Sequence, residues 1–130
     1  MGSFKANPRP TESELGILRV LWRLGPSTVR EVHGALDSGT GYTTVLKLMQ
    51  IMAEKGLVER DEQQRAHVYR TRLAQADTQQ QLTSDLLDRA FGGSASGLMM
   101  QLLNGRQVSS GELAELRRML DEYEAERRQP

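Results

Sequence analysis

Cysteine is absent from this 130-residue sequence, which excludes disulfide bonds, thiolate zinc sites and cysteine nucleophiles. The sequence also has no apolar run near the length that spans a membrane, so we expect no membrane insertion. The opening segment, MGSFKANPRP, lacks the apolar region of a signal peptide, and we expect residues 1–10 to form a flexible N-terminal arm. Together these absences fit a cytoplasmic protein.

Residues that commonly form catalytic or metal sites are scarce as well. The two histidines, His33 and His67, fall on separate predicted elements, and the sequence contains no HExxH motif. We therefore expect His33 to lie on a helix surface and to bind no metal. The glycine-rich segments at 39–41 and 92–97 lack a following Lys-Ser or Lys-Thr pair, so they are predicted to be a turn and a hinge. No base, nucleophile and orienting residue can be combined, and the sequence predicts neither an enzyme nor a bound cofactor.

The composition is that of a folded chain with a modest core, because 38% of the residues are hydrophobic and 26% are charged. The formal net charge is zero, but the charges are unevenly distributed. Residues 1–75 have three more basic than acidic residues, and residues 76–130 have three more acidic than basic residues. We expect the two parts of the chain to have different partners.

Three helices are predicted in the first half of the chain. The first covers 11–24 and starts with the capping-box pattern TESE. The second starts with a similar pattern, TVRE at 28–31, and ends before the glycine-containing segment 37–41. The third covers 42–55, its apolar residues recur at i, i+3, i+4 and i+7, and Gly56 follows as a C-cap.

Two short β-prone segments follow the third helix, LVER at 57–60 and HVYRT at 67–71, with a polar stretch between them. This pattern predicts a β-hairpin. The fold class is therefore expected to be mainly α: a winged helix-turn-helix domain over 11–75, with three helices and a hairpin wing, followed by a helical dimerisation domain over 76–130.

Amphipathic helices are predicted throughout residues 76–130. A helical pattern from Asp77 leads to the glycine-rich hinge, a short apolar piece covers 98–103, and a break is expected at Asn104–Gly105. Ser109 and Glu112 then form a capping-box pattern at the start of the last helix. The apolar stripes have little surface of their own chain to cover, so self-association is expected. The residues assigned to the dimer contact are Leu82, Leu86, Phe91, Leu98, Leu102, Leu113, Leu116 and Leu120.

The second and third helices, with the glycine-containing break between them, have the order of a helix-turn-helix unit. In such units the second helix of the pair enters the major groove of DNA. On a helical wheel Thr43, Lys47, Gln50 and Glu54 lie opposite the apolar stripe, and the first three can contact base edges or phosphate. Ordinary solvent-exposed positions would give the same wheel, so both interpretations stay open on this pattern alone.

The hairpin that follows the third helix favours the DNA-binding interpretation, because this order is the winged-helix arrangement. Arg65 and His67 lie at or near the tip of the hairpin, where we expect contacts with phosphate or the minor groove. An exposed polar turn accounts equally well for either residue taken alone. Further candidates for phosphate contacts are Lys47, Lys55, Arg60 and, in the N-terminal arm, Lys5 and Arg9.

Six segments resemble a known family in their order and spacing. They are TESELGILRVLW (11–22), TVREVHGAL (28–36), YTTVLKLMQIMAEKGLVER (42–60), HVYR (67–70), FGGSASGLMMQLL (91–103) and GELAELRRML (111–120). The family is that of the penicillinase repressors (BlaI/MecI), which are bacterial winged-helix transcription regulators. The resemblance covers nearly the whole chain after its first ten residues.

The resemblance implies a homodimer that binds a palindromic operator in double-stranded DNA and represses transcription. It implies that residues 11–72 bind the DNA and that residues 76–125 pair the subunits. Family members often have basic residues where Leu46 and Ile51 stand, so a different operator sequence is expected here. Carried over by position, the groove and backbone contacts are Tyr42, Thr43, Thr44 and Lys47.

The resemblance also implies a way of relieving repression. The family is often inactivated when a membrane-bound sensor metalloprotease cuts the dimerisation region. The usual Asn-Phe bond corresponds to Gln101–Leu102 in this sequence, which keeps the apolar second residue and lacks the asparagine. The copper-sensing branch of the family uses C-terminal cysteines, which this sequence does not have.

The sequence thus predicts a dimeric winged-helix repressor, and two alternatives stay open. In one, the same fold is switched by a small ligand in the dimerisation domain, with Met99 and Met100 lining a pocket beside the glycine hinge. In the other, the winged helix is a protein-interaction module that does not bind DNA.

Overall fold

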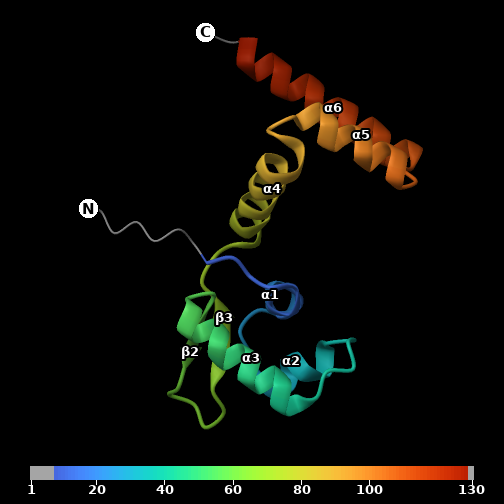
Figure 1. Ribbon diagram of the computed structural model, residues 1–130. Helices are drawn as coiled ribbons and strands as arrows, with labels where there is room; N and C mark the ends of the chain where they lie inside the picture. The colour runs from blue at the N-terminus through green and yellow to red at the C-terminus, as the bar shows by residue number, and fades with distance from the viewer. Residues whose placement is uncertain (1–7, 129–130) are drawn as a thin grey trace. The chain divides into compact units, whose positions relative to one another are not determined.

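The computed structural model describes residues 8–128, which form six helices and three short strands (Figure 1). The predicted fold class is confirmed: the chain is mainly helical and has a small antiparallel wing. The elements are α1 (Glu12–Leu24), β1 (Ser27–Thr28), α2 (Val29–Ala35), α3 (Tyr42–Lys55), β2 (Val58–Asp61), β3 (Val68–Thr71), α4 (Gln75–Phe91), α5 (Ala95–Gly105) and α6 (Ser110–Arg128).

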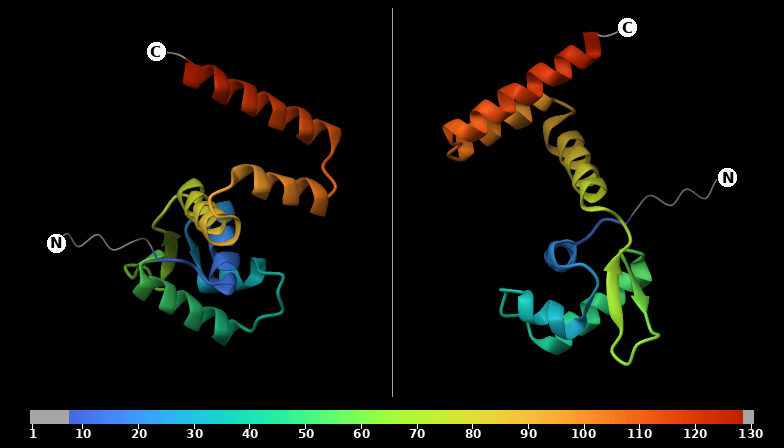
Figure 2. Two further views of the ribbon diagram at one scale, coloured as in Figure 1. Left: turned by 45° about the horizontal axis from the view of Figure 1, so that its top comes forward. Right: turned by 180° about the vertical axis from the view of Figure 1, so that it is seen from behind.

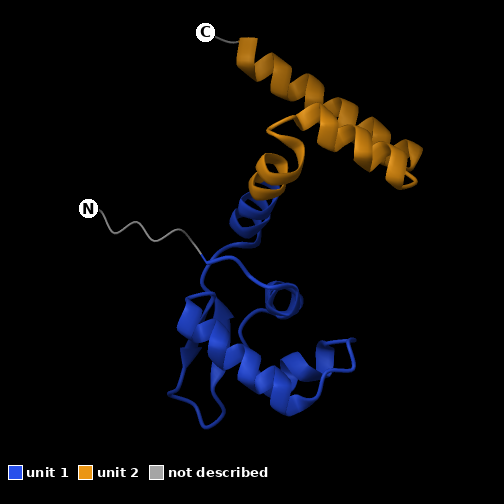
Figure 3. Ribbon diagram, viewed as in Figure 1, with its two compact units in different colours: residues 1–83 blue, residues 84–130 orange. Residues whose placement is uncertain are grey.

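The chain divides into two compact units, residues 1–83 and residues 84–130, and the division falls within α4 (Figure 3). The domain boundary expected at 75/76 stays a prediction, and most of the expected N-terminal arm lies outside the described residues. Within residues 8–128, no helix is both long and apolar enough to cross a membrane.

The first two helices begin at the residues that the capping patterns predict. Thr11 accepts a hydrogen bond from the backbone N–H of Glu14 at 3.2 Å, and the Glu14 side chain accepts from the N–H of Thr11 at 2.9 Å. The same reciprocal pair joins Thr28 and Glu31, at 3.2 and 2.9 Å. Each box provides acceptors for N–H groups that have no partner within the helix, so both helix starts are fixed locally.

The predicted hairpin is present, but it belongs to a three-stranded antiparallel sheet in the order β1-β3-β2. In the hairpin Val58 pairs with Thr71 and Asp61 with Val68, while Ser27 of β1 pairs with Tyr69. The sequence did not predict β1, because two residues are too few to show an alternating pattern. The hairpin lies beside α3 and forms the wing (Figure 2).

The core of the first unit lies where α1, α2, α3 and the sheet meet. Three residues of the apolar stripe of α3, Val45, Met49 and Met52, are completely buried, while Leu48 is half-buried against the core. Because this stripe faces α1 and α2, the opposite side of α3 faces solvent. The other buried hydrophobic residues are Ile17, Leu18, Val20, Leu21, Val29, Val32, Leu57, Val58 and Tyr69.

The second unit differs from the sequence expectation at two breaks. Gly92 and Gly93 adopt positive φ angles of 56° and 84°, but α5 starts at Ala95, because the hydroxyl of Ser94 accepts from the N–H of Gly97 at 3.0 Å. The hinge is therefore shorter than the expected 92–97. The break expected at Asn104–Gly105 is present but lies about one residue later, since α5 includes both residues and ends at Gly105.

Candidate nucleic-acid interface

The solvent-facing side of α3 carries the polar residues that the helical wheel placed there. Thr43, Lys47, Gln50 and Glu54 are all exposed. Thr44, which the family resemblance added, is exposed as well, and Tyr42 at the start of the helix is 44% exposed. Gly41 is the N-cap and offers no side-chain hydrogen bond to the first turn. The free N–H groups at that end are thus available to an external acceptor such as a phosphate oxygen.

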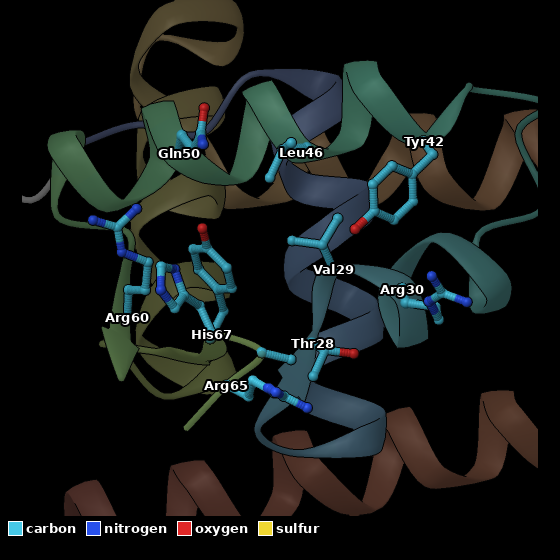
Figure 4. Close-up of a pocket in the computed structure, with 11 residues that line it drawn as sticks. Thr28, Val29, Arg30, Tyr42, Leu46, Gln50, Arg60, Arg65 and His67 are labelled. Carbon is cyan, nitrogen blue, oxygen red and sulfur yellow. The ribbon is translucent and has the colours of Figure 1, made fainter. Parts of the chain in front are cut away.

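A cleft of about 380 Å³ lies between α2, α3 and the wing, and we call it the α3–wing cleft (Figure 4). It brings together five of the predicted DNA contacts, two from α3 and three from the wing. Thr43, Thr44 and Lys47 lie outside the cleft, on the exposed side of α3. The lining residues are Thr28, Val29, Arg30, Tyr42, Leu46, Gln50, Arg60, Arg65, Ala66, His67 and Tyr69.

The floor of the cleft is apolar. Val29 and Tyr69 are buried core residues, and Leu46 is half-buried between the core and the cleft. Ile51, five residues further along α3, is half-buried too. Both side chains therefore pack against the protein, where a cation would be partly desolvated.

The rim of the cleft is cationic because it carries three arginines, Arg30 from α2, Arg60 from β2 and Arg65 from the loop of the wing, and His67 of the same loop also lines it. A hydrogen bond with the Tyr69 side chain, together with the nearby Glu62 carboxylate, raises the pKa of the Arg60 guanidinium further above its ordinary value. No acidic residue lies among the lining residues in the described part of the chain. The fold thus concentrates positive charge that is dispersed in the sequence, which is the electrostatic requirement for binding a phosphate backbone.

Arg30 and Thr28 are lining residues that the sequence analysis did not assign to the interface. Arg30 lies in α2 and Thr28 is the N-cap of that helix, some 30 residues before the wing, and α2 lies against both α3 and β1. The only sign in the sequence was that Arg30 is the second residue of a short capped helix, where it is expected to be exposed. That position is too common in proteins to identify a binding site.

His33 lies in the last turn of α2, as expected of a residue on a helix surface, and it is half-buried. Its Nε2 atom is 3.1 Å from the carbonyl oxygen of Thr40. Its ring meets the ring of Tyr42 edge to face, with 5.7 Å between centroids and an interplanar angle of 81°. His33 therefore contacts both the turn and the first residue of α3.

The far end of α3 is held by an ion pair with α1. The Lys55 ammonium is 2.6 Å from a carboxylate oxygen of Glu14, which is almost completely buried. Burial alone would raise the pKa of Glu14, but hydrogen bonds from Lys55 and from the Thr11 N–H outweigh it and lower the pKa. Glu14 is thus ionised at neutral pH, and the pair fixes the end of α3 on the start of α1.

The residues assigned to a dimer contact are distributed over α4, α5 and α6. In α5 and α6 no described residue is buried, and large apolar side chains are unusually exposed, among them Met100 at 59% and Leu120 at 62%. Met100, Leu103, Met119 and Tyr123 were not assigned, although they are as exposed as the residues that were. Of the assigned set, Leu86, Leu102 and Leu120 are exposed, and Leu82, Phe91, Leu98, Leu113 and Leu116 are half-buried.

Both residues of the proposed cleavage bond, Gln101 and Leu102, are exposed and lie inside α5. A second cleft of about 280 Å³ lies where α5 turns into α6, and its lining includes Met99 and Arg106. Met99 is thus at a cavity, as one alternative expected, whereas Met100 is not among the residues that line it.

Three helices, an antiparallel wing and a cationic cleft beside an exposed polar helix face define a winged-helix protein. The family model described as penicillinase repressor matches residues 10–122. This chain therefore belongs to the penicillinase repressor family, and the resemblance seen in the sequence is confirmed.

Relatives of known name agree with this assignment. The chain is 22% identical over 121 residues to the penicillinase repressor of Bacillus licheniformis, covering 92% of this chain and 94% of that protein. It is 34% identical over 116 residues to the transcriptional regulator BlaI of Mycobacterium tuberculosis, covering 86% of this chain and 83% of that protein. Each match covers more than four fifths of this chain, which is more than the winged helix alone.

Proposed function

We propose that this chain is a transcriptional repressor that binds a palindromic operator in double-stranded DNA as a homodimer. The observation that carries the proposal is the α3–wing cleft, whose three arginines and one histidine surround an apolar floor next to the exposed polar face of α3. An α-helix fits the major groove, and the uncharged Thr and Gln side chains of α3 can contact base edges without repelling phosphate. The cleft would hold the adjacent strand, with deoxyribose on the floor and phosphates at the rim.

Dimerisation is the second part of the proposal. The exposed apolar side chains of α5 and α6 leave the second unit without a core of its own, and a second copy of the same surface would cover them. Two linked winged helices would contact half-sites one helical turn apart, about 34 Å. Linking raises apparent affinity through effective concentration, which a single small module lacks.

Selection of bound duplexes from a random DNA pool tests this function directly. We expect recovered sequences to contain inverted half-sites whose centres are separated by one turn, or a whole number of turns, of the helix. If each half-site involves three or four phosphate contacts, affinity should fall by about three to five decades between 50 and 200 mM salt. Recovery of single, unpaired sites would contradict dimeric binding. Binding to no duplex at any salt concentration would favour the protein-interaction alternative.

We further propose that proteolysis within α5 relieves repression. Cutting the Gln101–Leu102 bond would separate α6 from the winged helix and would remove the link between half-sites without altering the DNA-contacting surface. Because the bond lies in a helix, α5 must open locally before the chain can enter a protease. Mass spectrometry of the chain after co-expression with a candidate membrane metallopeptidase tests this, and a fragment ending at any other residue would reject this bond.

A small ligand is the second candidate for the switch, and the cleft at the turn between α5 and α6 favours it. Its apolar lining includes Met99 and Leu116, with Arg106 as a cation suited to a carboxylate. A ligand bound there should raise the thermal midpoint of the protein and change its affinity for the selected duplex. A ligand that raises the midpoint without changing DNA affinity would not be a switch.

A further inference from the structure

The turn that leads into α3 is closed by His33. Gly39 has a φ angle of 73°, and the hydroxyls of Ser38 and Thr40 lie 2.8 Å apart. The Nε2 atom of His33 is 3.1 Å from the Thr40 carbonyl oxygen, and a carbonyl only accepts, so Nε2 carries the proton and donates. The last turn of α2 is thereby tied to the backbone two residues before α3.

The same imidazole ring restrains Tyr42, the first residue of α3. Tyr42 is 44% exposed, so core packing does not fix its ring. Its contact with His33 has the edge-to-face geometry that aromatic pairs prefer, at 5.7 Å and 81°. A tyrosine with two free side-chain torsions is thus held in one orientation by a neighbour that faces the turn.

That orientation directs the Tyr42 hydroxyl into the α3–wing cleft, toward Val29, and the next residue of α2, Arg30, lines the same cleft (Figure 4). His33 itself is not among the residues that line the cleft. A phenol hydroxyl and a guanidinium that line one cleft can both donate to the same phosphate group, and a phosphate contact fixes the register of a protein on the duplex.

We propose that His33 is a positioning residue for operator binding, which acts through Tyr42: it holds the phenol so that its hydroxyl meets a DNA phosphate together with Arg30. The inference rests on the proposed function. It adds a residue outside the contact surface and assigns a role to the hydroxyl of Tyr42.

A double-mutant cycle on the full-length chain measures this relation. The probe is a fluorescein-labelled duplex recovered from the random pool by the wild-type protein. We expect His33→Ala and Tyr42→Phe each to weaken binding by about 3- to 30-fold, and the double variant to bind no more weakly than Tyr42→Phe alone. Tyr42→Phe keeps the ring and removes only the hydroxyl. Without that hydroxyl, the orientation of the ring no longer affects the phosphate contact, so His33→Ala should cause no further loss of affinity.

Two readouts separate positioning from folding. The chain has three tyrosines, so 3-fluorotyrosine labelling gives three fluorine signals, from Tyr42, the buried Tyr69 and Tyr123 of α6. His33→Ala should move only the Tyr42 signal, identified by its loss in Tyr42→Phe. The matched control is Gly34→Ala, since a Cβ at this neighbouring exposed position of α2 meets nothing within 4 Å. It should leave affinity and all three signals unchanged.

His33→Gln provides the conservative variant, because it keeps a donor for the Thr40 carbonyl and removes the ring. We expect it to fold and to bind with an affinity between those of the wild type and His33→Ala. Should His33→Ala unfold, His33→Gln takes its place in the cycle and in the fluorine spectra.

Three results would overturn the inference while the proposed function stands. They are a loss in His33→Ala that persists undiminished in the Tyr42→Phe background, an unmoved Tyr42 fluorine signal, and wild-type affinity in His33→Gln. If the wild-type protein recovers no duplex from the pool, the proposed function fails and the inference fails with it.

Discussion

Single residues of the first unit fall into two groups, those that hold α3 in place and those that α3 presents to solvent. Glu14, Lys55 and His33 belong to the first group, since each contacts another element of the same unit. Lys47 and Gln50 belong to the second, and both are exposed. Substitutions in the first group should change stability or geometry, whereas those in the second should change DNA binding alone.

Lys47→Ala tests the second group. If Lys47 contacts a base, the variant should lose about 1–3 kcal/mol of operator binding and keep its stability. Binding to the selected duplex by fluorescence anisotropy is the measurement, with thermal unfolding as the companion. Arg117→Ala removes an equal charge from an exposed position of α6 and serves as the control. Equal losses in the two variants would mean that net charge alone matters, and no role would be left for Lys47.

Glu14→Gln tests the first group. At neutral pH the free energy of unfolding should fall by about 1–3 kcal/mol, because a buried carboxylate that accepts two hydrogen bonds is replaced by a neutral amide. The loss is limited to this range because Lys55 is partly exposed and water can hydrate its ammonium group. The folded state lowers the pKa of Glu14, so the stabilisation by its carboxylate is complete above the ordinary pKa and is lost as pH falls through the lowered one.

Urea unfolding at about pH 7 and about pH 3 measures this difference, which should shrink at the lower pH. Glu12→Gln is the control, since Glu12 lies in the same first turn and is exposed. A difference of constant size at both pH values would contradict the role of the ionised carboxylate.

At the scale of elements, the wing places two arginines beside α3 that follow it in the sequence. Arg60 lies in β2 and Arg65 in the loop, and pairing of β2 with β3 fixes both beside α2. The wing contributes no acidic side chain to the cleft lining within the described residues. We therefore expect the wing to contribute to affinity for any duplex rather than to the choice of sequence.

Arg65→Ala should weaken binding to the selected duplex and to unrelated duplexes by similar factors. The slope of log affinity against log salt should fall in magnitude by about one, as expected for the loss of one phosphate contact. Titrations at four or more salt concentrations give the slope, and Gln63→Ala in the same loop is the uncharged control. A loss confined to the selected duplex would instead assign Arg65 to base recognition.

The parts of the fold that depend on neighbouring residues could be predicted from the sequence. The capping boxes at Thr11 and Thr28 and the bounds of α3 are of this kind, since adjacent residues determine them. The strand β1 could not, because its two residues become a strand only by pairing with β3, about 40 positions later. The end of α5 was expected about one residue too early, because an Asn-Gly pair marks a break without fixing which of its residues is the last helical one.

The site was predictable only as a surface and not as a cleft. The exposed side of α3 follows from helical periodicity, which places Lys47 and Gln50 opposite the buried stripe. The contribution of Arg30 and the contact of His33 with Tyr42 depend on how α2 packs against α3, which no local pattern encodes. The small excess of basic residues in the sequence likewise gave no sign of how closely the fold would group them.

At the scale of the whole molecule, the main feature is that a single chain leaves large apolar side chains of α5 and α6 exposed to solvent. Leu120 is 62% exposed and Met119 51%, on a helix with no buried residue among those described. Charged pairs such as that of Arg118 with Glu122 at 2.6 Å give the same helix a soluble face. A helix with one charged and one uncovered apolar side is suited to pairing with a second copy.

Leu120→Asp should dissociate the homodimer and lower the apparent affinity for a two-half-site duplex by about 10²- to 10⁴-fold, the range over which linkage raises avidity. Sedimentation velocity gives the oligomeric state and anisotropy gives the affinity. The control is Leu24→Asp, the same change at an exposed leucine at the end of α1, which should leave sedimentation unchanged. Dimers that persist in Leu120→Asp would place the subunit contact elsewhere.

The attachment of α3 at both ends has a consequence for how this protein can evolve. The ion pair of Lys55 fixes one end and the contacts of His33 fix the other, so the exposed residues between them have no part in holding the helix. Mutations at these positions can then accumulate without lowering stability toward the threshold at which variants are lost. A lineage with this arrangement can change the DNA sequence that it recognises by single steps, each of which leaves a folded protein.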